Sequence, residues 1–335
     1  MLWIMPPVAG PSLSRLRLLT ASLVACLALL PGCRNDEFQS NTPGQSKGKK
    51  GTALPPNAPG GPSGSGEPIA LAAGANHSCA LRDNGRVSCW GSNLRGQLGH
   101  NKRIDFARPV TVQGLSDAVA IAVGDSHSCA IRHGGAVACW GGGDQGQLGN
   151  GKGGKGVGTA TPAEVLGIRD AKQIVAGSNH TCVLRGRGTV SCWGSNATRQ
   201  LGHERGQVSA KAVDVEGFSD AVELAAGRGH TCVRRKNGST LCFGANKRGQ
   251  LGDGGTTGHA RPSKVVGLTG GSQLVAAGDA TCSLTASGSL MCWGQGPHGN
   301  ANKPRVVQGV SAAKKLWLGG EHACVAADAN VLHCF

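Results

Sequence analysis

The sequence predicts an all-β fold, a β-propeller of about six four-stranded blades, and three observations lead to that prediction. From Ile69 onward the chain repeats itself with a period near 50 residues, which is typical of propeller blades and related arrays. Each repeat holds four short apolar runs separated by turn residues, as the four strands of one blade would. The composition agrees, because glycine accounts for 56 of the 335 residues and tyrosine is absent.

The apolar runs of the second repeat illustrate the expected strands. Its first run covers 120–123, its second run (128–131) leads into a turn, and its third run (136–140) leads out of that turn. A fourth strand is expected between repeats, at 109–112 and again at 304–307, each beginning with a proline. Proline fits the outer edge of a blade, where no ladder donor is needed.

Twelve cysteines recur in pairs ten residues apart, and the turn between the members of each pair predicts how they meet. If Arg82 pairs with Arg86, the hairpin loop has three residues and ends on Gly85, which tolerates positive φ; the sixth repeat has Asn330 there. Cys79 then falls opposite Cys89, in a cross-strand pair whose Cα atoms lie about 4.5 Å apart, within reach of a disulfide. One disulfide is expected in each blade: Cys79–Cys89, Cys129–Cys139, Cys182–Cys192, Cys232–Cys242, Cys282–Cys292 and Cys324–Cys334.

The N-terminus reads as an export and anchoring segment. Residues 1–32 combine two arginines with a short apolar core, which predicts a signal peptide. Leu30-Pro31-Gly32-Cys33 resembles the bacterial lipobox, so Cys33 is the expected lipidation site; the alternative is an ordinary cleaved signal with an incidental cysteine. Residues 33–68 are rich in Pro, Gly and Ser and predict a disordered tether before the propeller of residues 69–335.

Three short motifs recur with fixed internal spacing over residues 69–335. In the first repeat they are Gly-Ala-Asn-His-Ser-Cys (74–79), Cys-Trp-Gly (89–91) and Gly-Gln-Leu-Gly (96–99). Together they resemble the regulator-of-chromosome-condensation repeat family, in its bacterial secreted branch. That resemblance implies a propeller, usually of seven blades. Here six hairpins but only five outer strands are found, and the sixth repeat stops at Phe335, so we expect six blades with one strand missing. A seven-bladed-like or incompletely closed ring, completed by a partner or left open, is the alternative.

Two sets of repeated side chains are candidate ligand sites. Recurring histidines on a propeller axis suit either a metal or anion site or, as we expect, structural hydrogen bonds within each blade, since the fifth repeat has no histidine. They are His77, His127, His180, His230 and His322. The aromatic residues after the second cysteines are expected to pack between blades rather than to stack on a ligand; they are Trp90, Trp140, Trp193, Phe243, Trp293 and Phe335.

Nothing in the sequence supports catalysis. It contains no Gly-x-Ser-x-Gly, no His-Glu-x-x-His and no P-loop, and no pair of acids suggests an acid and a base. No Cys-x-x-Cys spacing suggests zinc. We therefore expect a non-enzyme without cofactor or metal.

The loops that break the repeat are basic, and the net charge of +15 favours an anionic partner. The candidate binding residues are Lys102, Arg103, Phe106, Lys152, Lys155, Arg234, Arg235 and Lys236, with solvated loops as the alternative. The predicted function is an interaction scaffold, lipid-anchored in the bacterial cell envelope at the outer membrane, in the periplasm or at the cell surface. It would bind a protein or an anionic surface polymer and contact the membrane through its lipid; an exported chain is an unlikely partner for nucleic acid.

Two other functions stay open at this point. One is inhibition or regulation of a secreted enzyme, which differs from the scaffold only in its partner. The other is guanine-nucleotide exchange on a small GTPase, which the resemblance implies for one eukaryotic branch. Exchange needs a cytosolic chain with reduced cysteines, against which the export segment and the cysteine pairs both argue.

Overall fold

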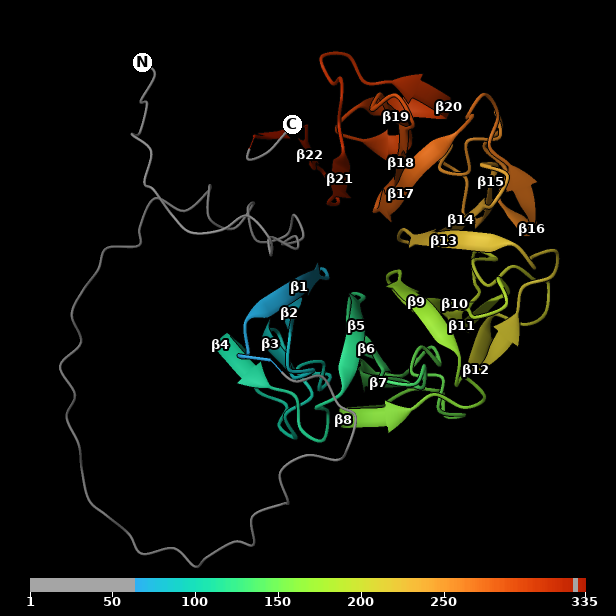
Figure 1. Ribbon diagram of the computed structural model, residues 1–335. Coiled ribbons are helices and arrows are strands. Elements are labelled where there is room, and N and C mark those ends of the chain that lie inside the picture. Colours follow the sequence, from blue (N-terminus) through green and yellow to red (C-terminus); the bar gives the residue numbers. More distant parts are fainter. Residues whose placement is uncertain (1–63, 328–330) are drawn as a thin grey trace, which may run out of the picture.

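Six small antiparallel sheets stand around a common axis in the computed structural model, which describes residues 64–327 and 331–335 (Figure 1). The expected signal peptide, Cys33, most of the tether and Asn330 lie outside the described residues. Within the described residues, no helix has the length and apolar character needed to cross a membrane. Each of the first five sheets has four strands, ordered along the chain from the axis outward, and the sixth has three.

The strands have the following bounds. Blade 1 contains β1 (Pro68–Ala73), β2 (His77–Arg82), β3 (Val87–Gly91) and β4 (Phe106–Thr111), and blade 2 contains β5 (Ala118–Val123), β6 (His127–Arg132), β7 (Val137–Gly142) and β8 (Gly158–Glu164). Blade 3 contains β9 (Ala171–Ala176), β10 (His180–Arg185), β11 (Val190–Ser195) and β12 (Val208–Asp214), and blade 4 contains β13 (Ala221–Ala226), β14 (His230–Arg235), β15 (Thr240–Gly244) and β16 (His259–Lys264). Blade 5 contains β17 (Gly271–Ala277), β18 (Asp279–Thr285), β19 (Leu290–Gly296) and β20 (Gly299–Val306), and blade 6 contains β21 (Lys315–Leu318), β22 (Ala323–Ala326) and β23 (Leu332–Cys334).

The hairpin register is the one predicted from the turn. The amide of Arg82 donates to the carbonyl of Arg86 at 2.9 Å, Gly85 has a φ of 73°, and Cys79 lies directly opposite Cys89. All six predicted disulfides are present, each within one blade. The Cα atoms of each pair are 4.1 Å apart, as a directly opposed cross-strand pair requires.

The outer strands begin earlier than predicted. β4 starts at Phe106, so Pro109 lies inside the strand instead of heading it, and β12 contains no proline. The cause is an irregularity in the ladder between Cys89 and Gly91, beyond which the pairing resumes with Gly91 opposite Phe106. The outer position itself is as expected, and proline is tolerated there because one side of the strand has no neighbour.

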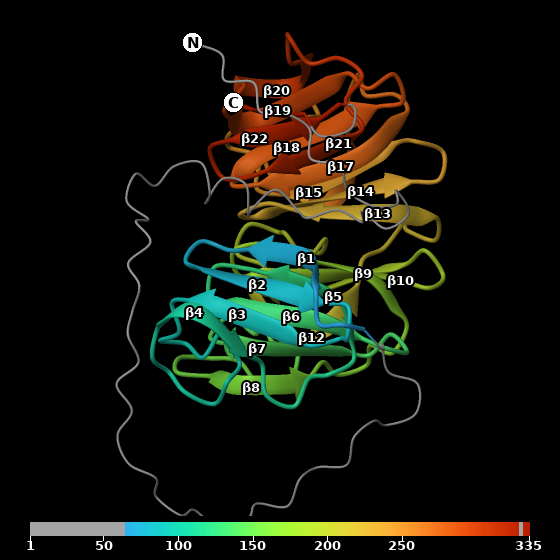
Figure 2. The same ribbon diagram turned by 60° about the vertical axis from the view of Figure 1, so that its left-hand side comes forward.

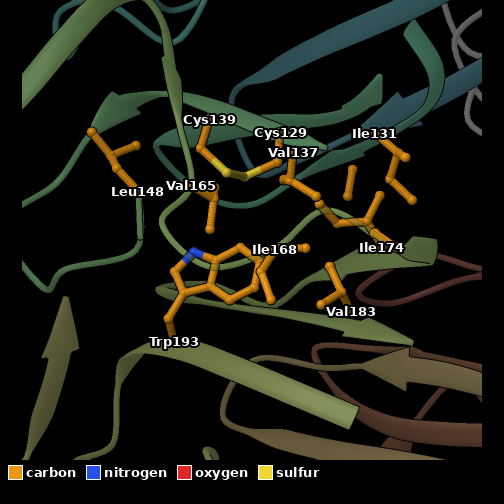
Figure 3. Packing of buried hydrophobic residues seen from close by; sticks show 12 residues of the cluster. Cys129, Ile131, Val137, Cys139, Leu148, Val165, Ile168, Ile174, Val183 and Trp193 are labelled. Carbon is orange, nitrogen blue, oxygen red and sulfur yellow. A yellow bond between two sulfur atoms is a disulfide. The ribbon is translucent and has the colours of Figure 1, made fainter. Parts of the chain in front are cut away.

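The hydrophobic core lies between blades and not only within them. Figure 3 shows one cluster, in which Trp193 of blade 3 faces Val165 and Ile168 of blade 2, with the Cys129–Cys139 disulfide beyond them. Equivalent clusters join the other neighbouring blades. The prediction that the repeated aromatics pack between blades is confirmed for Trp140, Trp193, Phe243 and Trp293, which have no exposed surface. Trp90 is only half-buried and Phe335 is 39% exposed.

A hydrogen-bond relay crosses each interface among the first five blades. The histidine that begins the second strand of one blade contacts, through Nε2, a Ser or Thr hydroxyl of the next blade. The hydroxyl donates in turn to a glutamine carbonyl of the Gly-Gln-Leu-Gly-type loop in the first blade. The histidine contacts are His77–Ser128 (2.8 Å), His127–Thr181 (2.9 Å), His180–Thr231 (3.0 Å) and His230–Thr281 (2.7 Å), and the accepting carbonyls belong to Gln97, Gln147, Gln200 and Gln250.

The tryptophan of the next blade completes this relay. The indole N–H groups of Trp140, Trp193 and Trp293 donate to the same glutamine carbonyls at 2.9, 2.9 and 3.0 Å. The histidines were expected to bond within their own blade, and that expectation is wrong, because the polar partner belongs to the following blade. Their structural role is nevertheless clear, since the relay buries four imidazoles at the blade interfaces.

A glycine makes room for each of these rings. A Cβ atom built on Gly177 would meet the imidazole of His180 and the carbonyl oxygen of Gly227 in the next blade. Gly124 has the same relation to His127 and to the carbonyl of Gly177. The Gly-x-x-His spacing therefore allows two blades to approach closely beside the axis.

The blades form an arc rather than a closed ring. Consecutive blades touch through their inner strands, from β1 against β5 to β17 against β21. Figures 1 and 2 show a break between blade 1 and blade 6, and among the described strands no comparable contact joins these two blades. The structure thus has six blades, of which the last has three strands, as predicted. The ring is not closed, which corresponds to the alternative of an incompletely closed ring.

The covalent hairpins yield a prediction for stability. The double variant Cys129→Ser/Cys139→Ser is expected to lose up to ~3 kcal/mol of unfolding free energy. The reason is that the variant, without this crosslink, gains more entropy on unfolding than the wild type does. Urea unfolding under non-reducing conditions measures this loss. Alkylation of the wild type should label none of the twelve paired cysteines, whereas a labelled wild type or a variant of unchanged stability would contradict the prediction.

Burial of the relay histidines predicts that stability depends on pH. Desolvation lowers the pKa of His77 and His230 to about 4, and desolvation with the neighbouring histidines lowers the pKa of His127 and His180 to about 3. In the unfolded chain the same groups titrate near 6.5. The unfolded state therefore binds more protons below pH 6.5, and stability, fully present above that pH, is lost as the pH falls towards 4.

The expected result is a urea midpoint that drops steadily between pH 6.5 and 4.5. Each of these histidines contributes up to ~1.4 kcal/mol per pH unit in that range. The variant His180→Asn should flatten the profile by one group, and His133→Ala, which changes an exposed histidine on a hairpin, is the matched control. A midpoint that stays constant over this range would refute the prediction.

Candidate binding face

The two ends of the blades form two different faces. The loop face carries the loops 74–76 and 92–105 of blade 1 and their equivalents, which lie together because the amide of Ser92 donates to the carbonyl of Asn76. The hairpin face carries the hairpin 83–86, the link 112–117 and their equivalents, joined by the hydrogen bond from Ala118 to Gly85. The predicted binding residues divide between these faces.

Four of the predicted cations lie on the loop face, in the neighbouring loops 92–105 and 143–157. The Arg95 guanidinium and the Asp144 carboxylate hold these loops side by side with an ion pair of 2.8 Å. All four side chains are exposed, and none of them has an ion-pair partner among the described residues: Lys102, Arg103, Lys152 and Lys155. We refer to these four residues as the basic patch.

Buried polar groups fix the backbone beneath the basic patch. The side-chain amide of Asn93, which is fully buried, donates to the carbonyls of Lys102 and Ile104 at 2.8 and 3.0 Å. In the next loop the Asp144 carboxylate accepts the amide of Gly156 at 2.8 Å. The basic side chains therefore project from loops whose backbone these hydrogen bonds hold in place, so that binding would order little backbone.

Phe106 supports this loop from the side. Its ring is half-buried, packs against the blade 1–blade 2 core and meets the imidazole of His100 edge-on at a centroid distance of 4.6 Å. Burial, and then the positive charge of Lys102, lower the pKa of His100. Phe106 therefore lies beside the basic patch, and only the part of its ring that is not packed against the core remains exposed.

The remaining predicted residues lie on the other face. Arg234 pairs with Glu223 at 2.7 Å, and Arg235 pairs with Asp220 at 2.7 Å. Of that triplet only Lys236 is exposed and lacks an ion-pair partner among the described side chains. The sequence run Arg-Arg-Lys therefore does not join the basic patch, because two of its charges neutralise acids of their own blade.

Three further cations of the loop face were not predicted. Arg199, Lys247 and Arg248 surround a cavity of about 490 Å³ that also includes Asp279. Arg199 is partly engaged by Glu204 at 3.2 Å. The sequence contains a signal for Arg199 and Arg248. Like Arg95, each stands one or two positions before the recurring Gln-Leu-Gly run of its repeat.

One cluster of potential metal ligands occurs in the described part of the chain. The sulfur atoms of Cys282 and Cys292 lie close to the imidazole of His298. The two sulfurs are joined in a disulfide, so neither is a thiolate that could bind a metal. The cluster is therefore explained by the blade's own covalent bond.

Comparisons with known proteins agree with this architecture. The family model described as the RCC1-like domain matches residues 32–332. Among solved structures, yeast RCC1 (Prp20), crystallised with Kap60, superposes with a TM-score of 0.68 at 23% identity, over 76% of this chain and 65% of the yeast chain. Human WBSCR16 superposes with a TM-score of 0.70 at 17% identity, over 78% of this chain and 74% of the human chain.

A plant receptor domain has the same fold at lower similarity. The CRINKLY WD40 ectodomain of the receptor kinase ACR4 from Arabidopsis thaliana superposes with a TM-score of 0.52 at 18% identity, over 82% of this chain and 80% of the plant chain. The match to yeast RCC1 spans slightly less than two thirds of that protein. At these identities the superpositions establish the fold, and the family model covers most of the sequence. The chain belongs to the RCC1-like domain family.

Proposed function

We propose that this protein is a binding propeller, held at the bacterial cell envelope by a lipid on Cys33, that captures a protein with an acidic surface on its loop face. Capture would be stoichiometric and without turnover. The observation that carries the proposal is the basic patch, four exposed cations without ion-pair partners among the described side chains, on two adjoining loops with fixed backbones.

A protein partner is in keeping with the structural relatives. The yeast relative was crystallised with Kap60, and a second study of Prp20p concerns its binding to Gsp1p and histones. Those partners are partners of the yeast protein. For this chain, rigid blades with charged loops at one end suit the same general use, because binding residues commonly lie on loops positioned by a rigid scaffold.

Electrostatics favour the loop face over the hairpin face. On the hairpin face several arginines are held by acids of the same blade, as Arg132 is by Asp117 and Arg185 is by Asp170. The hairpin face also has three exposed cations without ion-pair partners among the described side chains, Arg86, Arg187 and Lys236. These three lie on three separate blades, whereas the four cations of the basic patch lie on two adjoining loops. Unpaired charges at a rim mainly steer and orient an oppositely charged partner, and their effect falls with salt.

The envelope location is supported by two independent features. The lipobox-like segment ends at Cys33, and twelve cysteines form six disulfides, which persist in oxidising compartments. Both features disfavour guanine-nucleotide exchange in a reducing cytosol. Inhibition or regulation of a secreted enzyme is the remaining alternative, and it would use the same face for a different partner.

Anchoring predicts a specific intact mass. Protein purified from its own host without reductant should begin at Cys33, be heavier than that sequence by its acyl groups, and carry no thiol that can be alkylated. Electrospray mass spectrometry before and after treatment with an alkylating reagent checks all three. A full-length chain with free thiols would overturn the envelope proposal and leave the binding proposal to be tested in the cytosol.

Charge reversal in the basic patch predicts loss of binding. The variant Lys102→Glu/Lys152→Glu/Lys155→Glu should bind the partner that wild-type protein captures from host membranes about tenfold more weakly or worse, that is, by ~1.4 kcal/mol or more. Wild-type binding should weaken as the salt concentration rises. Titration calorimetry or surface plasmon resonance with the purified partner measures both effects.

The matched control reverses three exposed cations on the hairpin face, Arg86→Glu/Arg187→Glu/Lys236→Glu, so that the net charge changes by the same amount. This variant should keep most of the affinity. Equal losses in the two variants would mean that net charge and not the loop face governs binding, and an unaffected loop-face variant would refute the proposed site.

A further inference from the structure

One arginine of the loop face has a backbone conformation that the other repeats give to glycine. Arg199 has a φ of 67°. The equivalent residues of blades 1, 2 and 4 are glycines with φ values of 85°, 74° and 79°, namely Gly96, Gly146 and Gly249. A Cβ atom on any of these glycines would come within 2.6 to 2.8 Å of the backbone of the next blade's outer strand. The repeat therefore favours glycine for two reasons, and residue 199 has a long side chain in spite of both.

The contacts of Arg199 within the chain do not account for this exception. Its guanidinium pairs with the Glu204 carboxylate at 3.2 Å and donates to the carbonyl of Gly258 at 3.1 Å. The side chains of the ion pair are 50% and 68% exposed, and a pair so open to solvent contributes little to stability. A residue that keeps a disfavoured backbone conformation without such compensation points to a role in binding.

The loop-face cavity lies where one loop of blade 5 is shorter than its equivalents. In blades 1–4 two residues stand between the glycine and the histidine of the Gly-x-x-His run. In blade 5 Ala280 takes the place of the histidine, and only Asp279 separates it from Gly278. Between blades 3 and 4 the longer loop closes onto its neighbour, because the Thr198 hydroxyl donates to the carbonyl of Gly229 at 2.9 Å. The shorter loop of blade 5 has no residue equivalent to Gly229, and Asp279 borders the cavity of about 490 Å³ instead.

The cations around this cavity lack the acids that neutralise their equivalents elsewhere. In blade 2 Asp144 neutralises Arg95 of the preceding blade, and the equivalent residue of blade 4 is Lys247, a cation. Lys247 and its neighbour Arg248 are both exposed and have no ion-pair partner among the described side chains. Together with Arg199, three cations line a cavity whose lining contains a single acid, Asp279.

The remaining polar groups of the lining are mostly occupied by hydrogen bonds within the chain. The Thr198 hydroxyl and the side-chain amide groups of Asn246 and Gln250 all have partners in neighbouring loops. Asp279 accepts the Gln250 amide at 3.3 Å through Oδ1, whereas its Oδ2 has no hydrogen bond to a described residue. The groups open to a ligand are therefore three cations and one carboxylate oxygen that can accept a proton donor.

We infer that this cavity binds a sugar phosphate, that is, a phosphate monoester on a small molecule with several hydroxyl groups. The ester is nearly doubly charged at neutral pH, which matches three cations set against one acid, and guanidinium groups bind phosphate oxygens with paired N–H donors. A ligand hydroxyl would donate to Asp279, which would repel an anion without such a donor, including a carboxylate side chain of a protein. The volume is in the range of small-molecule sites. The inference does not rest on the basic patch, which lies on blades 1 and 2.

Titration calorimetry on the purified full-length protein tests the ligand class. The probes are glucose 1-phosphate, glucose 6-phosphate and glycerol 3-phosphate, and the matched compounds are glucose, inorganic phosphate and glucuronate. At least one probe should bind ~tenfold more tightly than each matched compound, a difference of ~1.4 kcal/mol. Inorganic phosphate binding as tightly as the probes would mean a site for simple anions, and glucuronate binding as tightly would mean a carboxylate site. Either result, or no binding of any probe, would overturn the inference.

Two variants test the residues. Arg199→Gly, which restores the residue of the other repeats, should weaken binding of the tightest probe about tenfold, while the thermal midpoint stays the same or rises because glycine adopts this φ without strain. The matched control Arg205→Ala removes an exposed cation from the same loop outside the cavity and should keep the affinity.

Asp279→Ala should reduce the preference for the probe over inorganic phosphate severalfold, because the acceptor of the ligand hydroxyl is gone. An unchanged affinity or a lower thermal midpoint in Arg199→Gly, an equal loss of affinity in Arg205→Ala, or an unchanged preference in Asp279→Ala would each contradict the proposed site.

Discussion

The histidine–hydroxyl contact between neighbouring blades is the interaction on which the rest of this structure depends. No blade can make it alone, because the imidazole and the glutamine carbonyl belong to one blade and the hydroxyl to the next. It constrains the sequence at several places at once, since the close approach requires glycine beside the ring, and the buried tryptophan of the next blade donates to the same glutamine carbonyl. Burial in these interfaces keeps the imidazoles uncharged, because desolvation lowers their pKa.

The sequence predicted the fold well because the informative features are local and repeated. The ten-residue spacing of Cys79 and Cys89, with glycine between them, determines a hairpin register and hence a disulfide without reference to the rest of the chain. The ion pairs of Arg234 and Arg235 could not be predicted from such local spacing. Their acids lie on the innermost strand and on the link before it, so that a run of three basic residues gave no indication that two of its charges are paired.

The placement of every described disulfide inside a single blade has a consequence for how such a chain changes over time. If a disulfide joined two blades, removal of either repeat would leave an unpaired thiol in the other. Here a whole unit can be gained or lost by recombination and no cysteine is orphaned. An arc of six blades therefore has its disulfides as complete as a ring of seven blades would.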